Sequence, residues 1–151
     1  MEPTVKTARE HLKLTRDAYR ETIRGMDQAA LNWTPGPDTN SAAVLVVHIA
    51  GSEGELLRTI RGLPTERDRD AEFRATAGAD AELLAKLDEM DAFFEEMAPH
   101  ITADDLASPR TRWNGTTNTG LYWLLHDVSH LREHLGHIQL TNQLYERRST
   151  R

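Results

Sequence analysis

At 151 residues, with 38% hydrophobic and 28% charged residues, the chain is expected to fold as one globular domain over residues 1–151 rather than to be disordered or divided. Because cysteine is absent, the sequence excludes disulfides, a thiolate nucleophile and a zinc site of the finger type. The net charge of −6 comes from interspersed acidic and basic residues, which argues against a nucleic-acid partner because such a partner requires a basic stripe.

Four stretches of the chain carry apolar residues at the spacing of amphipathic helices. The predicted helices cover Pro3 to Arg24, Asn40 or Ser41 to Gly62, Asp80 to Ala98, and Thr119 to Arg147. Gly25 is expected to end the first helix, and Asn40 or Ser41 is expected to cap the second. The first half of the second helix is apolar nearly all round, which predicts deep burial.

The connections between these helices differ in character. Residues 25–40 contain a Pro-Gly-Pro sequence that interrupts a helix, although Asp27 can cap one short turn there. Residues 65–78 are dense in charge and are expected to form an exposed loop. Residues 100–118 are expected to form a second loop, with one short turn at Ala-Asp-Asp-Leu. No segment alternates polar and apolar residues for long enough to predict a strand.

Four long helices without strands indicate an all-α fold. The expected architecture is a four-helix bundle with an up-down-down-up or related antiparallel topology. Bundles of this kind build metal and cofactor sites from side chains on facing helices. Polar residues that interrupt the apolar faces are therefore the candidates for function.

Four of the seven histidines lie in the last predicted helix, at His126, His130, His134 and His137. A helix advances about 100° per residue, which places His130 and His134 at the edge of the apolar face and the other two further toward a flank. Two imidazoles one turn apart can converge on one ion at about 2.0–2.1 Å each. The pair His130 and His134 is therefore the candidate metal site of this helix.

A third ligand has to come from another helix, and His48 is the candidate. It interrupts the apolar sequence VLVVHIA, where burial of an imidazole without a partner is costly. Gly51 and Ser52 follow one turn later and leave room beside it. The alternative is a hydrogen-bonded core histidine that binds no metal. His11 and His100 have no comparable context and are expected on the surface.

Three further residues are weaker catalytic candidates. Glu55 follows His48 on nearly the same face and could be an acid/base or a partner of a ligand, with a solvated carboxylate as the alternative. Asp127 could orient a histidine through its free ring nitrogen or capture an arginine. His137, and His126 with it, could join the metal site or remain on its flank.

The segments LNWTPGPDTNSAAVLVVHIAGSEGELL and LYWLLHDVSHLREHLGHIQLTNQL together resemble the DinB/YfiT-like superfamily of bacterial proteins. The shared pattern is a Trp-x-Pro connection, an Asn-Ser helix start with a histidine seven residues on, and His-x3-His-x-Gly in the last helix. The resemblance implies a four-helix bundle that holds a divalent metal, commonly nickel or zinc, on three histidines, which fall here on His48, His130 and His134. His137 stands where the family often has glutamine, so it either replaces a structural amide or adds a group beside the site.

The resemblance also implies a range of functions. Characterised members of the superfamily include thiol S-transferases that use bacillithiol or mycothiol and a mycothiol-dependent isomerase. The first expectation is therefore a metal-dependent enzyme that transfers a low-molecular-weight thiol to a small-molecule electrophile, and the second is a metal-dependent hydrolase. The competing class is a non-catalytic, stress-associated binding or dimerisation bundle whose histidines are structural or vestigial.

The compartment, the membrane contact and the oligomeric state of the protein can also be predicted. The amino terminus is charged and lacks a hydrophobic signal core, which favours a cytoplasmic protein. The longest apolar run, Ala42 to Ala50, is far shorter than a membrane span, so no membrane partner is expected. The resemblance suggests that the chain forms a homodimer.

Overall fold

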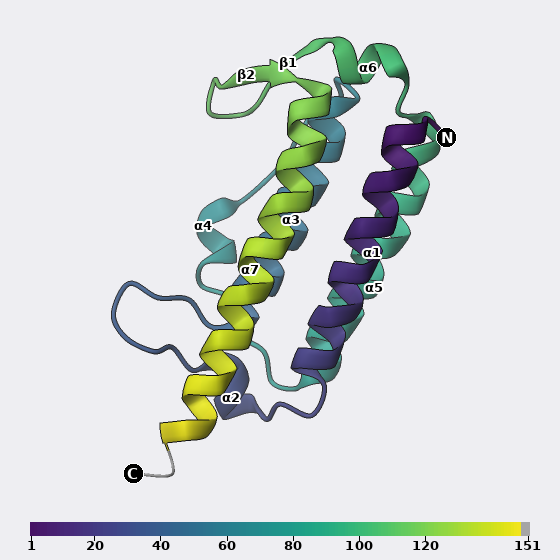
Figure 1. Cartoon of the computed structure of the whole chain (residues 1–151). Helices are drawn as coiled ribbons and strands as arrows, with labels where there is room; N and C mark the ends of the chain where they lie inside the picture. Colours follow the sequence, from purple (N-terminus) through teal and green to yellow (C-terminus); the bar gives the residue numbers. More distant parts are fainter. Residues whose placement is uncertain (149–151) are drawn as a thin grey trace.

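The computed structural model describes residues 1–148, so the end of the predicted domain, residues 149–151, lies outside the described residues. Its four long helices lie side by side (Figure 1). They are α1 (Pro3–Ile23), α3 (Ala42–Ile60), α5 (Asp80–Met97) and α7 (Gly120–Arg148). The predicted helical bundle is confirmed, and the helix bounds agree with the predicted ones within about two residues.

The order of the helices determines which faces meet. α1 and α7 run in one direction along the bundle, whereas α3 and α5 run in the other, in keeping with an up-down-down-up order (Figure 1). α7 packs against α1 and α3, and α5 packs against the same two helices, so the four form a ring around the core. Residues on facing sides of α3 and α7 can therefore build a common site.

The helix ends follow from local chemistry. Ser41 caps α3, because its Oγ accepts a hydrogen bond from the Val44 backbone nitrogen at 3.2 Å. Gly25 follows α1 with φ of +84°, a left-handed conformation that glycine adopts without a steric penalty. The predicted cap and the predicted stop are both confirmed.

Two short helices confirm the turns expected in the connections. α2 (Gln28–Asn32) is capped by Asp27, whose Oδ1 accepts from a backbone nitrogen at 2.8 Å. α6 (Ala103–Ala107) begins with a capping box in which Thr102 and Asp105 exchange hydrogen bonds between side chain and backbone. A single 3-10 turn, η1 (Ala98–His100), links α5 to this segment.

The structure differs from the prediction in two connections. Residues 65–78 contain a short helix, α4 (Arg69–Glu72), and Glu72 is buried, so the expectation of an exposed loop is wrong at this point. Residues 100–118 end in a hairpin of β1 (Pro109–Thr111) and β2 (Thr117–Thr119), paired antiparallel. Strands of three residues are too short to show the alternation from which strands are predicted.

The core lies along the axis of the ring, and every long helix contributes to it. α5 is amphipathic, as its apolar spacing predicted, and it buries Leu83, Leu87, Met90, Phe94 and Met97. The first half of α3 is buried nearly all round, as predicted. Among the described residues, no helix is long and apolar enough to cross a membrane.

Candidate metal centre

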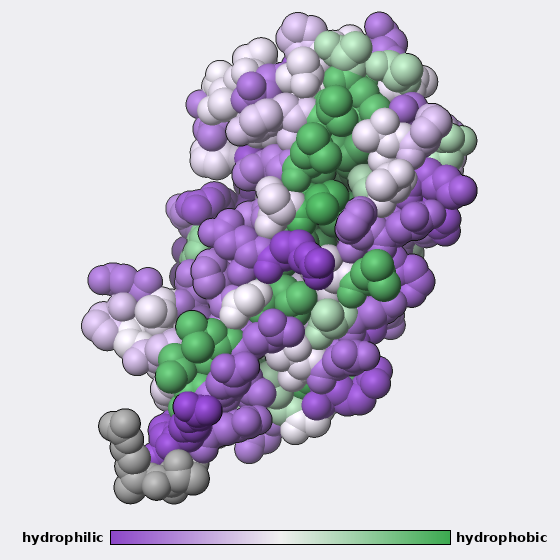
Figure 2. Space-filling model, in the orientation of Figure 1, coloured by the Kyte–Doolittle hydropathy of each residue, from purple (hydrophilic) through white to green (hydrophobic). Residues whose placement is uncertain are grey.

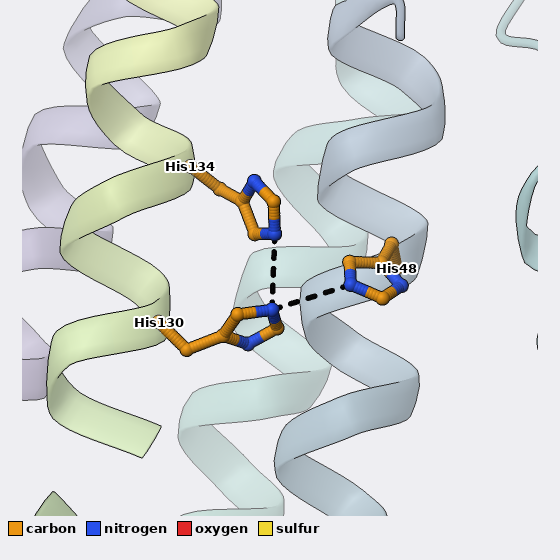
Figure 3. Close-up of side chains that lie close together, drawn as sticks. All are labelled: His48, His130 and His134. Carbon is orange, nitrogen blue, oxygen red and sulfur yellow. Dashed lines mark hydrogen bonds between the residues drawn. The ribbon is translucent and has the colours of Figure 1, made fainter. Parts of the chain in front are cut away.

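Three histidines meet between α3 and α7. His130 Nε2 lies 3.3 Å from His48 Nε2 and 2.9 Å from His134 Nε2. One nitrogen from each of the three rings lies within 4.8 Å of the others. Figure 3 shows His48 reaching from one helix toward His130 and His134 on the other. The structure thus brings together the three residues that the sequence analysis selected as ligands.

The spacing of these nitrogens suits a common ion. Ligand atoms about 2.0–2.1 Å from one ion lie roughly 2.9 Å apart at a right angle and roughly 3.3 Å apart at the tetrahedral angle. The two measured separations, 2.9 and 3.3 Å, fall at these values. Imidazole is a suitable ligand for zinc and nickel alike. The three residues could therefore hold a divalent ion.

Glu72 fixes the orientation and the tautomer of His48. His48 Nδ1 lies 2.9 Å from Glu72 Oε2. Because a carboxylate accepts, the shorter of the two contacts of Nδ1, 2.9 Å to Glu72 against 3.3 Å to Arg67 Nη2, favours a proton on Nδ1 and a lone pair on Nε2 that faces the other two rings. Arg67 in turn donates to both oxygens of Glu72, at 2.7 and 2.8 Å. This is the carboxylate–histidine arrangement that orients metal ligands in proteins.

Gly51 makes room for this carboxylate. A Cβ atom placed at Gly51 would lie 2.0 Å from Glu72 Oε1, a separation that no side chain tolerates. Glu72 was not predicted as a site residue, because its segment has the charge density of an exposed loop. The available signal was the glycine itself, since glycine inside a helix costs about 1 kcal/mol relative to alanine and so indicates a close approach.

The Nδ1 atoms of His134 and His130, which are the outer nitrogens of these two rings, have different surroundings. His134 Nδ1 lies 3.1 Å from His137 Nδ1, so one of these nitrogens donates and the other accepts. His130 Nδ1 is buried and has no hydrogen-bond partner among the described residues. Asp127 therefore does not orient His130 in the way the sequence analysis considered.

Electrostatics favours neutral rings. Burial, with His134 and His48 acting in the same direction, lowers the pKa of His130 to about 3. Burial, followed by the nearby His48, lowers the pKa of His134 to about 4. Burial also lowers the pKa of His48, although the Glu72 carboxylate opposes this effect. Neutral imidazole is the form that binds a metal ion.

The remaining histidines lie outside the convergent set. His126 stacks on His130 with ring centroids 5.6 Å apart, on the flank predicted for it. Burial lowers the pKa of His126, and the positive charge of Arg112 acts in the same direction. His11 and His100 are exposed, as predicted.

Glu55 is held by arginines rather than by the histidines. Its carboxylate accepts hydrogen bonds from Arg112 and, at 3.4 Å, from Arg67. Its side chain is 1% exposed, so it is not the solvated helix carboxylate considered as an alternative. Through these arginines, α3 anchors both the hairpin and the segment that carries Glu72.

Asp127 belongs to a separate buried cluster. Burial raises its pKa to about 7, and both of its oxygens lack a hydrogen-bond partner among the described residues. Nearby, Arg16 donates to Glu53 at 2.7 Å and to Asp91 at 2.6 Å. Asp127 thus makes a hydrogen bond neither to a histidine nor to an arginine.

The sequence model of the DinB superfamily matches residues 11–138, a range that includes the three convergent histidines and Glu72. The chain belongs to the DinB superfamily. No curated protein sequence matches it significantly.

Solved structures of DinB-like proteins share the fold. A conserved protein from Enterococcus faecalis superposes with a TM-score of 0.78 at 16% identity, over 95% of this chain and 97% of its own. A DinB-like protein from Bacillus subtilis gives 0.70 at 18% identity, over 91% and 90%. A mycothiol-dependent maleylpyruvate isomerase gives 0.67 at 14% identity, over 89% of this chain and 62% of its own. At these identities the likeness shows the fold alone.

Proposed function

We propose that this DinB-superfamily chain is a metal-dependent enzyme that acts on a small molecule, with His48, His130 and His134 as the ligands of one divalent ion. The observation that carries the proposal is the convergence of three imidazoles in which one lone pair is already directed inward by Glu72. A zinc or nickel ion on three neutral ligands keeps its positive charge and open positions, and it lowers the pKa of a thiol or water bound there.

The residues around the ligands have distinct roles in this proposal. Glu72 orients the His48 ring and makes its Nε2 a stronger electron-pair donor to a metal ion, while Arg67 holds Glu72 in place. His137 supports the outer nitrogen of His134. Glu55 and Asp127 touch none of the three ligands through a hydrogen bond, so we assign them no part in the reaction.

The reaction we favour is transfer of a low-molecular-weight thiol to an electrophile. The chain has no cysteine, so any thiol must come from a cosubstrate. A structure of the same fold is a mycothiol-dependent maleylpyruvate isomerase, which supports a thiol as the cosubstrate. In the transfer, a sulfur–carbon bond forms, the bond to the leaving group breaks, and the thiol proton passes to solvent. Hydrolysis at the same centre is the second choice.

The ligand set can be tested by metal content. Purified protein is expected to carry about one zinc or nickel ion per chain by elemental analysis, and His130→Ala and His134→Ala are expected to lose it. His11→Ala and His100→Ala are the matched controls, because both residues are exposed histidines of the same chain. Full metal occupancy in His130→Ala would refute the ligand assignment.

Turnover distinguishes an enzyme from a binding protein. We expect zinc- or nickel-loaded protein to accelerate the reaction of a cysteine-derived thiol with 1-chloro-2,4-dinitrobenzene, and EDTA to abolish the acceleration. Metal binding without turnover of the thiol or of a model ester would instead support the non-catalytic bundle.

Exposed apolar side chains favour a homodimer, which is also part of the alternative of a non-catalytic dimerisation bundle. Leu14 on α1 is 66% exposed, and Leu121 and Leu125 on α7 are exposed as well. Figure 2 shows apolar surface running along this side of the bundle. Sedimentation of the wild type and of Leu14→Asp would show whether this face joins two copies, since the substitution is expected to give a monomer.

A further inference from the structure

A pocket of about 400 Å³ adjoins the histidine centre on the carboxyl-terminal side of α7. It lies between the connection that precedes α3 and the second half of α7, and His134 and His137 form part of its wall. Figure 2 shows apolar surface at this end of α7, beside the connection that precedes α3. A volume of this size is in the range of small-molecule sites in proteins.

Most of the exposed surface of this pocket is apolar, although Thr39, Asn40 and Thr141 also line it. Pro35, Leu45, Leu140 and Leu144 supply its apolar surface. Asp38 is the one charged side chain in its lining, and no lysine or arginine among the described residues contributes to it. An uncharged apolar group placed there would gain by leaving water, whereas an anionic group would lose hydration with no lysine or arginine in the lining to compensate it.

Two leucines of this lining lie exposed on the surface of α7. Leu140 is 55% exposed and Leu144 is 42% exposed, one turn apart on the same face of α7. They do not serve the bundle core, which is formed by their buried neighbours Leu135 and Ile138. An apolar occupant of the pocket would cover them, and its position would be beside the ligand His134.

We infer that this pocket binds the uncharged apolar group of the electrophilic substrate and places it beside the metal centre. That the bound molecule is a substrate rests on the proposed function. The preference of the pocket for an uncharged apolar group rests on its lining alone. The lining assigns to this pocket an uncharged group of the substrate, aromatic or aliphatic.

A matched pair of fluorescent probes tests the preference. N-phenyl-1-naphthylamine is neutral, whereas 1-anilinonaphthalene-8-sulfonate has the same ring system with a sulfonate. We expect the neutral probe to bind with enhanced fluorescence and at least about tenfold more tightly than the anionic one. Absence of binding by the neutral probe, or tighter binding of the sulfonate, would overturn the inference.

Substitutions on α7 locate the bound probe. Leu140→Asp and Leu144→Asp are expected to weaken the neutral probe at least about tenfold, because each places a carboxylate in the lining. Leu125→Asp is the matched control, since Leu125 lies on the same helix with 56% exposure but does not line the pocket. Equal weakening by the control would show that the probe binds elsewhere.

Metal loading separates the two proposals. Binding of the neutral probe is expected both with EDTA and with zinc, so it survives even if the chain holds no ion. Where metal binds, cobalt is expected to quench the bound probe relative to zinc, because His134 belongs to both the ligand set and the pocket wall. Equal fluorescence of the cobalt and zinc forms would contradict the placement of the pocket beside the centre.

Discussion

Two clusters of buried and half-buried polar side chains lie between the helices of this bundle, and they differ in origin and in pairing. The ionic cluster takes one residue from each long helix: Arg16, Glu53, Asp91 and Asp127. The histidine cluster takes its three nitrogens from α3 and α7 alone and its outer carboxylate from α4. The first therefore ties the whole bundle together through charge, whereas the second directs neutral lone pairs at one point.

The two clusters show that buried polar groups can either hold paired charges or present uncharged ligand atoms. In the ionic cluster, burial raises the pKa of Glu53 and the guanidinium of Arg16 opposes this effect, so removal of Arg16 would leave the carboxyl groups of Glu53 and Asp91 without their cation. In the histidine cluster, the convergent nitrogens carry no charge, so the loss of one ring removes a ligand without leaving an ion unpaired. We expect the first cluster to determine stability and the second to determine metal affinity.

The largest expected effect is the loss of Arg16. Arg16→Met should lower the free energy of unfolding by about 3–5 kcal/mol, because Glu53 would remain buried without its cation. Chemical denaturation measures this change. Arg9→Met is the matched control, since Arg9 pairs with Glu95 at the exposed surface, where water and salt screen the pair and its loss changes stability little. Equal losses in the two variants would contradict the role of the ionic cluster.

The next effect concerns Asp127 and pH. Burial raises its pKa from 3.8 to about 7, with Arg16, Arg112, Glu55 and Glu53 as its charged surroundings. Between pH 4 and 7 the folded chain thus holds a proton that the unfolded chain has released. The free energy of unfolding should therefore fall as pH rises through this window, by up to about 1.4 kcal/mol per pH unit, and level off above it.

Asp127→Asn should remove this contribution and make the protein about 2–4 kcal/mol more stable than the wild type at pH 8. Denaturation curves at several pH values test the expectation. Parallel pH profiles for the variant and the wild type would show that Asp127 is ionised throughout. The metal content should be the same in both proteins.

A smaller effect is expected when Glu72 is displaced from His48. Gly51→Ala puts a methyl group 2.0 Å from the Glu72 carboxylate oxygen and should weaken zinc binding about 10–100-fold. Gly54→Ala is the matched control in the same helix, because its nearest new contact is ordinary, 3.6 Å from Arg58. Competition with a chelator measures both affinities. Unchanged affinity in Gly51→Ala would show that Glu72 does not support the centre.

The smallest effect is expected at His137. His137→Leu removes the partner of the His134 outer nitrogen and should weaken zinc binding about tenfold or less, because His137 is exposed and water can replace it. His137→Gln keeps a polar group at the same position and should bind zinc as the wild type does. Equal affinities in the leucine and glutamine variants would assign His137 a role outside the centre.

The helices and the histidines could be predicted because both depend on local periodicity. The cap at Ser41, the stop at Gly25 and the stripe of α5 each follow from residues within one or two turns. His130 and His134 share a helix, so their proximity follows from the pitch alone. His48 could be selected because an imidazole in an apolar segment needs a partner.

The remaining parts of the site depend on contacts between distant segments. Glu72 acts on His48 only because α4 packs against α3, and the segment around it is rich in exposed charged residues such as Asp70 and Arg74. The state of Asp127 depends on Glu53 and Arg16, which approach it from two other helices. The spacing of residues along one helix carries no information about either contact.

The segment that connects α3 to α5, residues 61–79, also affects the histidine cluster. Because both helices run in the same direction, residues 61–79 travel back along the bundle and carry Glu72 past His48 (Figure 1). In the proposed centre, the basicity of His48 thus depends on a connector, the kind of segment in which insertions and substitutions are tolerated best. Grafting other return segments onto this bundle would give a series of centres with identical ligands and graded metal affinity.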